Sequence, residues 1–192
     1  DWGNDLDAML AAVSERTRLI FIANPNNPTG TWLTEGKLKA FIEALPDHVV
    51  TVIDEAYAEY VELPDYPDCT SWIHRHDKLL VTRTFSKIYG LAGLRVGYGV
   101  SSPGLADYLN RVRQPFNVNS MGLAAAAIAL DDAAHIHASC KANREGMALL
   151  EDACHERGLG FIPSAANFLA INFGQPTAGL YREMMQRGVI VR

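Results

Sequence analysis

The sequence predicts an α/β protein built around a parallel sheet with helices packed against it. Three short apolar runs in the first half are nearly continuous rather than alternating, which is typical of strands buried on both faces. A segment with apolar residues at helical spacing separates the first two runs. Strand, helix and strand over about 30 residues form a βαβ unit, so we expect these strands to be parallel.

The strands of this sheet are expected in the first half of the chain. Their predicted ranges are Leu19–Ala23, Val49–Ile53, Leu79–Val81 and Val96–Val100. The helix between the first two should occupy Thr34–Leu45, because Thr34 can cap its N-terminus and Pro46 cannot continue it.

The second half changes to a mainly helical pattern. The predicted helices are Pro103–Val112, Met121–Leu130, Asp132–Arg157 and Thr177–Gln186. Gly158 ends the longest helix, a short apolar run follows at Asn167–Phe173, and a last strand is expected at Val189–Val191. We therefore predict a large domain at 1–130 whose N-terminal part is missing, a connecting helix at 131–158, and the truncated start of a small α+β domain at 159–192.

Composition excludes several classes of function. The 192 residues carry 17 Lys and Arg against 22 Asp and Glu, for a net charge of −5, which disfavours general binding to nucleic acid. The longest apolar run, Gly122–Leu130, is far short of the ~20 residues of a membrane span. Cys69, Cys140 and Cys154 have no CxxC spacing, so we predict no disulfide framework, no metal site and a reducing, cytoplasmic setting.

Polar clusters follow three of the predicted strands. In open α/β sheets, ligands bind at the carboxyl ends of the strands. The first cluster, 24–30, reads Asn-Pro-Asn-Asn-Pro-Thr-Gly, in which prolines and a glycine fix a turn that presents amide groups, among them Asn27. Taken alone, the cluster favours a simple turn between a strand and a helix.

The second cluster follows the strand at Val49–Ile53. Asp54 leaves an apolar strand, so we expect it to be partly desolvated and to need a cationic or N–H partner. Tyr57 could aim its hydroxyl at the same ligand. The alternative is a salt bridge at the strand end with a tyrosine at an interface.

The third cluster, 84–99, holds Lys87 between hydroxyl groups and a glycine turn. A desolvated lysine near other cations has a lowered pKa and can form a Schiff base. Thr84, Ser86 and Arg95 would suit a phosphate group. The alternative is a glycine-rich loop with a surface lysine. The segment lacks the third glycine of a Rossmann fingerprint and the Gly-Lys-Ser/Thr of a Walker loop.

Taken together, the three clusters match the needs of pyridoxal phosphate: a lysine, a carboxylate for the pyridine nitrogen, donors for the ring oxygen and a phosphate site. Over essentially its whole length the sequence resembles the fold-type I pyridoxal-phosphate enzymes of aminotransferase class I/II. The motifs that carry the resemblance are Asn27-Pro28-Thr29-Gly30, Asp54-x-x-Tyr57, Ser86-Lys87-x-x-Gly90 and Arg95. The resemblance implies a three-layer αβα large domain and part of a small α+β domain.

Within the family, the sequence of several stretches is most similar to the histidinol-phosphate aminotransferases. The stretches concerned are 83–98, Gln114–Asn119, Ser164–Phe168 and Gly188–Arg192. This resemblance implies ping-pong transfer of an amino group between L-histidinol phosphate and 2-oxoglutarate, a step of histidine biosynthesis. Threonine-phosphate decarboxylase, aromatic aminotransferase and a pyridoxal-phosphate-binding sensor domain of a transcription regulator remain alternatives, since they share the same constellation.

The resemblance also implies roles for residues of this chain. Lys87 would bind the cofactor as an imine and move the proton between Cα and C4′. Asp54 would hold the pyridinium nitrogen, and Asn27 and Tyr57 would hydrogen-bond the ring oxygen.

Phosphate binding is implied for Thr84, Ser86 and Arg95. Asn117 and Asn119 would reach the site of a second subunit in a homodimer, and Arg192 would face the substrate. Members of the family run to roughly 350 residues, so we expect this chain to be a piece of a longer enzyme and to be inactive alone.

Overall fold

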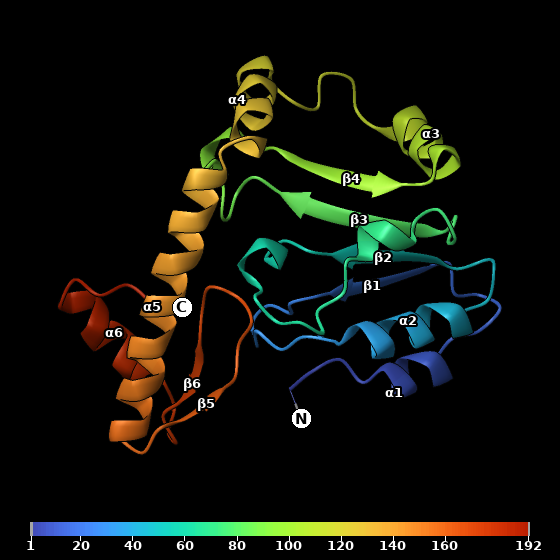
Figure 1. The fold of residues 1–192 in the computed structure, drawn as a ribbon. Coiled ribbons are helices and arrows are strands. Elements are labelled where there is room, and N and C mark those ends of the chain that lie inside the picture. The colour runs from blue at the N-terminus through green and yellow to red at the C-terminus, as the bar shows by residue number, and fades with distance from the viewer. Residues whose placement is uncertain (1, 192) are drawn as a thin grey trace.

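The computed structural model describes residues 2–191, and its elements follow the predicted order (Figure 1). The sheet region contains α1 (Leu6–Ala11), β1 (Leu19–Ala23), α2 (Glu35–Ala44), β2 (Val50–Asp54), β3 (Leu79–Thr84) and β4 (Gly97–Ser101). The remaining elements are α3 (Pro103–Val112), α4 (Ser120–Leu130), α5 (Ala133–Glu156), β5 (Gly160–Ile162), β6 (Ala170–Asn172) and α6 (Ala178–Gln186). Short 3₁₀ turns lie at Ala58–Tyr60, Cys69–Trp72 and Ala92–Leu94.

The main sheet has the strand order β1-β2-β3-β4. β1, β2 and β3 are parallel, which confirms the predicted βαβ unit, whereas β4 runs antiparallel to β3. Ala23 is paired with Asp54, and Asp54 with Thr82, so the carboxyl ends of the three parallel strands lie at the same edge. This edge is where the predicted polar clusters begin.

One face of the sheet packs against α1 and α2. The buried side chains of α2 are Leu38, Phe41 and Ile42, which follow one another at helical spacing, as predicted. They share a core with sheet residues such as Ile22 and Ile53, both almost completely buried. Burying each such side chain contributes about 1.5–3 kcal/mol, so this face anchors the sheet. α1 was not among the predicted elements.

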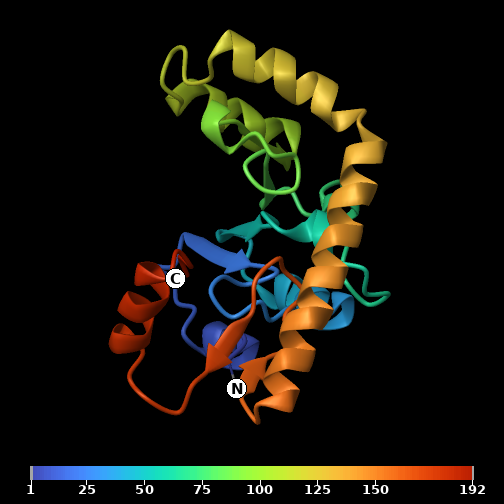
Figure 2. The same cartoon turned by 90° about the vertical axis from the view of Figure 1, so that its left-hand side faces the viewer.

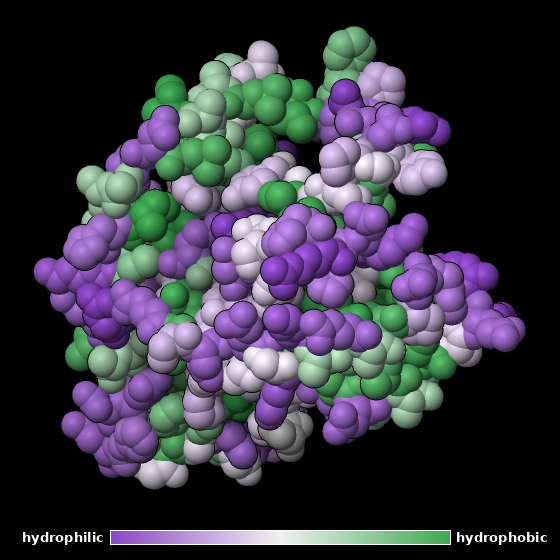
Figure 3. All heavy atoms as spheres, turned by 45° about the vertical axis from the view of Figure 1, so that its right-hand side comes forward, coloured by the Kyte–Doolittle hydropathy of each residue, from purple (hydrophilic) through white to green (hydrophobic). Residues whose placement is uncertain are grey.

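The opposite face is less covered than the sequence predicted. Leu19 is 55% exposed and Phe21 69% exposed, so the expectation that β1 is buried on both faces is wrong for residues 2–191. The physical reason is that no helix in this part of the chain packs over these two side chains. Figure 3 shows further hydrophobic patches in the upper part of the molecule, where α3 and α4 lie.

The 24-residue helix α5 runs along one side of the sheet region and leads to the small β5–β6 hairpin and α6 (Figure 2). Asp132 caps its N-terminus through a bond from the backbone N–H of His135 at 3.0 Å, and Gly158 follows its end with φ of 64°. β5 was not among the predicted strands. The division into domains at the two ends of α5 stays a prediction.

The predicted strand at Val189–Val191 is wrong. The segment forms no strand, and Ile190 is 80% exposed. Alternating or apolar character makes a strand only where another strand supplies hydrogen-bond partners, and no described strand lies against this segment. None of the helices in residues 2–191 combines the length and apolarity that crossing a bilayer requires.

Candidate functional site

The register of the sheet sorts the residues at its carboxyl edge onto two faces. Asp54 is opposite Thr82, and side chains alternate along a strand, so Asp54, Thr82 and Thr84 share one face. By the same alternation Glu55 and Arg83 lie on the other face, which α1 and α2 cover. The candidate polar residues therefore stand on the less covered face of this edge.

Three predicted residues meet beside this edge. The Asn27 amide donates a hydrogen bond from Nδ2 to the Tyr57 hydroxyl at 2.8 Å. The Lys87 Nζ lies 5.1 Å from the centre of the Tyr57 ring, within the range of a cation–π contact. Tyr57 is only 6% exposed, and the ring of Phe168 packs edge-on against it at 5.2 Å. Phe168 was not predicted as a site residue, although the stretch 164–168 is among the family motifs.

A second group surrounds the turn that holds Lys87. The backbone N–H of Ser86 donates to Thr84 Oγ1 at 3.0 Å, so the Thr84 hydroxyl proton remains free to donate elsewhere. The Arg95 guanidinium donates from Nη1 to Ser86 Oγ at 3.3 Å and to the Ala92 carbonyl at 2.9 Å. Among the salt bridges found in residues 2–191, Arg95 takes part in none. An exposed guanidinium beside hydroxyl donors suits an anion such as phosphate.

The desolvation expected at Asp54 and Lys87 is not observed. Both residues are exposed, because they lie on the face that the described helices leave open. One Asp54 oxygen, Oδ1, accepts the backbone N–H of Ala56 at 3.1 Å, which supplies the N–H partner that the sequence predicted.

The buried acid at this edge is Glu55 rather than its neighbour. Glu55 is completely buried, and its Oε2 accepts from Arg83 Nε at 2.9 Å and Nη2 at 2.7 Å. Its other oxygen, Oε1, is buried without a partner among the described residues. Burial lowers the pKa of Arg83, but the hydrogen bond and the charge of Glu55 outweigh it and leave the pKa raised.

The alternative of a strand-end salt bridge therefore holds for Glu55. The signal in the sequence was that side chains alternate in direction along a strand, which places Glu55 on the core face. A carboxylate buried there needs a cationic partner.

The residues predicted to reach a second subunit make contacts within this chain. Asn119 caps α4: its Oδ1 accepts the N–H of Gly122 at 2.7 Å, and its Nδ2 donates to the Leu94 carbonyl at 2.9 Å. Asn117 Oδ1 accepts from Arg113 Nη1 at 3.0 Å. Their substrate roles stay predictions, and Arg192 lies outside the described residues.

The turn that carries Asn27 is fixed by close contact at Gly30. Gly30 has φ of 74°, and its carbonyl accepts the N–H of Ala165 at 2.9 Å. A Cβ at this position would lie 2.0 Å from Ser164 Oγ and 3.0 Å from Ser164 Cα. The turn and the segment that carries Phe168 therefore approach each other as closely as only glycine allows.

Replacing Gly30 with alanine should destabilise the protein by about 2 kcal/mol or more, because it combines a positive φ with overpacking. Chemical denaturation of the whole protein measures this change. Gly36→Ala is the matched control, since Gly36 lies in α2 with nothing within 4 Å of an added Cβ. It should be neutral or stabilise by up to about 1 kcal/mol. Equal effects of the two substitutions would contradict the close contact.

The chemistry of the grouped side chains fits pyridoxal phosphate, the cofactor implied by the sequence resemblance. A phenol and an amide already share a hydrogen bond and can serve a ring oxygen, an amine lies beside them, and a guanidinium with two hydroxyls can hold an anion. Asp54 supplies a carboxylate from the neighbouring strand end.

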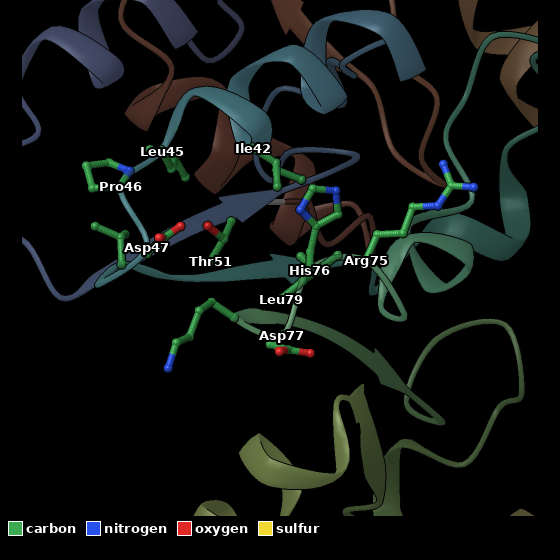
Figure 4. Close-up of a pocket in the computed structure, with 11 residues that line it drawn as sticks. Ile42, Leu45, Pro46, Asp47, Thr51, Arg75, His76, Asp77 and Leu79 are labelled. Carbon is green, nitrogen blue, oxygen red and sulfur yellow. The ribbon is translucent and has the colours of Figure 1, made fainter.

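A pocket of about 340 Å³ lies at the amino ends of the strands, opposite the carboxyl edge. Its lining includes Asp47, Thr51 and Leu79. In Figure 4 the Arg75 side chain extends away from Asp47 and Thr51, so the lining does not converge on a common point. This pocket contains none of the predicted site residues.

The family model for aminotransferase class I and II matches residues 1–192. Histidinol-phosphate aminotransferase 1 of Nitrosococcus oceani is 56% identical over 191 residues, which cover 100% of this chain and 52% of that protein. Histidinol-phosphate aminotransferase 2 of Methylococcus capsulatus is 54% identical over 191 residues, with the same coverage.

Among solved structures, histidinol-phosphate aminotransferase of Sinorhizobium meliloti in complex with pyridoxal-5'-phosphate matches with a TM-score of 0.91 at 34% identity. The match covers 99% of this chain and 53% of that one. The chain thus has the fold of these enzymes and spans about half the length of the curated relatives it matches.

Proposed function

The chain belongs to the class I and II aminotransferase family, and from that premise we propose that the whole protein is a histidinol-phosphate aminotransferase that uses pyridoxal phosphate. It would transfer the amino group of L-histidinol phosphate to 2-oxoglutarate. The observation that carries this proposal is the identity above 50% to histidinol-phosphate aminotransferases along the full chain.

Each polar group at the carboxyl edge has a part in this proposal. Tyr57 and Asn27 would hold the ring oxygen, since their hydrogen bond already fixes the hydroxyl. Asp54 would accept a hydrogen bond from the pyridine nitrogen and keep it protonated. When bound, pyridoxal phosphate acts as an electron sink for the bond that breaks at the substrate α-carbon.

The turn after β3 would bind the phosphate group and would also bind the cofactor covalently. Thr84, Ser86 and Arg95 would bind the phosphate group through their hydroxyls and guanidinium. The Lys87 Nζ would bind the cofactor covalently and, once released, carry a proton away from the substrate α-carbon and return it to the cofactor. Its position beside the Tyr57 ring keeps the amine near the ring oxygen site.

We further propose that the protein acts as a cytoplasmic homodimer. The exposed apolar side chains around the loop between α3 and α4 support an interface, with Val112 79%, Phe116 98% and Met121 74% exposed. Asn117 lies in this loop, and it and Asn119 would reach the site of the second subunit, while Arg192 would bind substrate.

Amine-donor profiling of the whole protein tests the function. With 2-oxoglutarate as acceptor, we expect the kcat/KM for L-histidinol phosphate to exceed that for aromatic amino acids by at least about a hundredfold. An amine donor without a phosphate group would leave the cations that bind the substrate phosphate unpaired. A preference for an aromatic amino acid would make the protein an aromatic aminotransferase. Release of carbon dioxide from threonine phosphate would favour the decarboxylase, and cofactor binding without turnover would favour a sensor.

A further inference from the structure

One side of α5 donates hydrogen bonds to backbone carbonyls of three loops. His135 Nε2 lies 2.9 Å from the Ile88 oxygen, Cys140 Sγ donates to the Glu59 oxygen at 3.2 Å, and Asn143 Nδ2 donates to the Ala166 oxygen at 3.4 Å. Each of these carbonyls lies within two residues of a side chain of the candidate site, because Lys87, Tyr57 and Phe168 are the neighbours concerned. The side chains of α5 thus contact the backbone of the loops that carry the site residues.

The contact at Ile88 is the shortest of the three and the nearest to the reacting groups. A carbonyl oxygen can only accept, so Nε2 must carry the proton, in the neutral ring as well as in the charged one. The backbone of His135 is itself fixed at the N-terminus of α5, where its N–H donates to Asp132 Oδ1 at 3.0 Å. The donor therefore comes from a rigid element.

The acceptor belongs to the turn that carries Lys87. The Ile88 side chain is 2% exposed, so its burial in the protein interior anchors the turn. The N–H of Gly90 donates to the Lys87 carbonyl at 2.9 Å, and the N–H of Leu91 to the Phe85 carbonyl at 2.9 Å. With His135 added, the peptide planes on both sides of Ile88 are held, which leaves the Lys87 backbone little freedom to rotate.

We propose that His135 is a positioning residue for Lys87, which acts by holding the Ile88 carbonyl and with it the backbone of the lysine turn. This rests on the proposed function, in which Lys87 binds the cofactor. As a positioning residue, His135 would touch neither substrate nor cofactor. It couples the direction of the Lys87 side chain to the start of α5.

Three variants of the whole protein test the proposal. His135→Ala removes the donor, and His135→Gln keeps an N–H donor at a similar reach. His137→Ala is the matched control, because His137 lies two residues along α5 and is exposed. The first readout is hydrogen–deuterium exchange of residues 85–91 in the protein without cofactor, and the second is the dissociation constant of pyridoxal phosphate.

We expect His135→Ala to speed exchange in the turn and to weaken cofactor binding about two- to tenfold, as for the loss of one ordinary hydrogen bond. His135→Gln should recover most of both effects, and His137→Ala should match the unmodified protein. Unchanged exchange in His135→Ala, or a loss that His135→Gln does not recover, would overturn the proposal. If the unmodified protein binds no pyridoxal phosphate, the proposed function fails instead, while the exchange experiment still decides whether His135 holds the turn.

Discussion

Replacing Lys87 with alanine is expected to lower the kcat of the whole protein by about a thousandfold or more. The substitution removes both the amine that binds the cofactor and the base that moves the proton, and a positioned proton-transfer group alone contributes about 10²–10⁴-fold. The Asn27–Tyr57 hydrogen bond does not involve Lys87, so pyridoxal phosphate should still bind, though without a covalent link. Steady-state kinetics and the absorption spectrum of the bound cofactor measure the two effects.

Lys78→Ala is the control for this substitution. Lys78 precedes β3 at its amino end, whereas Lys87 follows the same strand at its carboxyl end. The control should keep its turnover and the absorption spectrum of the unmodified protein. An unchanged spectrum and turnover in Lys87→Ala would remove that lysine from the chemistry and leave it a surface residue.

The second large effect concerns stability. Arg83→Leu should destabilise the protein by about 3–5 kcal/mol, because it leaves the completely buried carboxylate of Glu55 without its cation. Burial, then the charge of Glu55, raises the pKa of the Cys69 thiol, so this neighbour is neutral and does not replace the lost cation. Denaturant unfolding of the whole protein measures the change.

A double variant separates the lost ion pair from lost packing. Glu55→Leu combined with Arg83→Leu removes both charges, and it should recover most of the stability that Arg83→Leu loses. Arg144→Leu breaks the ion pair with Glu62, in which both side chains are more than half exposed, and should have little effect. If Arg83→Leu is as mild as Arg144→Leu, the Glu55–Arg83 pair does not hold the ends of β2 and β3 together.

The elements near the site could be predicted from the sequence because local signals agree with the packing there. The segment after β1 has helical spacing in Leu38, Phe41 and Ile42, and the same residues form the buried face of α2. The strands β1 and β2 start or end within one residue of the predicted bounds, since their apolar runs are bordered by turn residues.

What could not be predicted depends on partners that are distant in the sequence. The direction of β4 follows from its pairing with β3, which no pattern within 96–100 specifies. Val189–Val191 has the composition of a strand but lies beside no described strand. In the site, Asp54 and Lys87 were found from their places after strands. Only the folded chain reveals the contacts of Arg83, Phe168 and His135. Their partners, Glu55, Tyr57 and Ile88, lie 28, 111 and 47 residues away in the sequence, respectively.

We propose that the turn after β3 places Lys87 at the carboxyl edge of the sheet as the residue that binds pyridoxal phosphate. The direct test is to reduce the cofactor-loaded whole protein with borohydride, digest it and locate the cofactor mass by peptide mass spectrometry. We predict that the mass lies on the peptide containing Ser86, Lys87 and Ile88, with Lys87 modified. Attachment to a different lysine, or no attachment after reduction, would contradict the assignment.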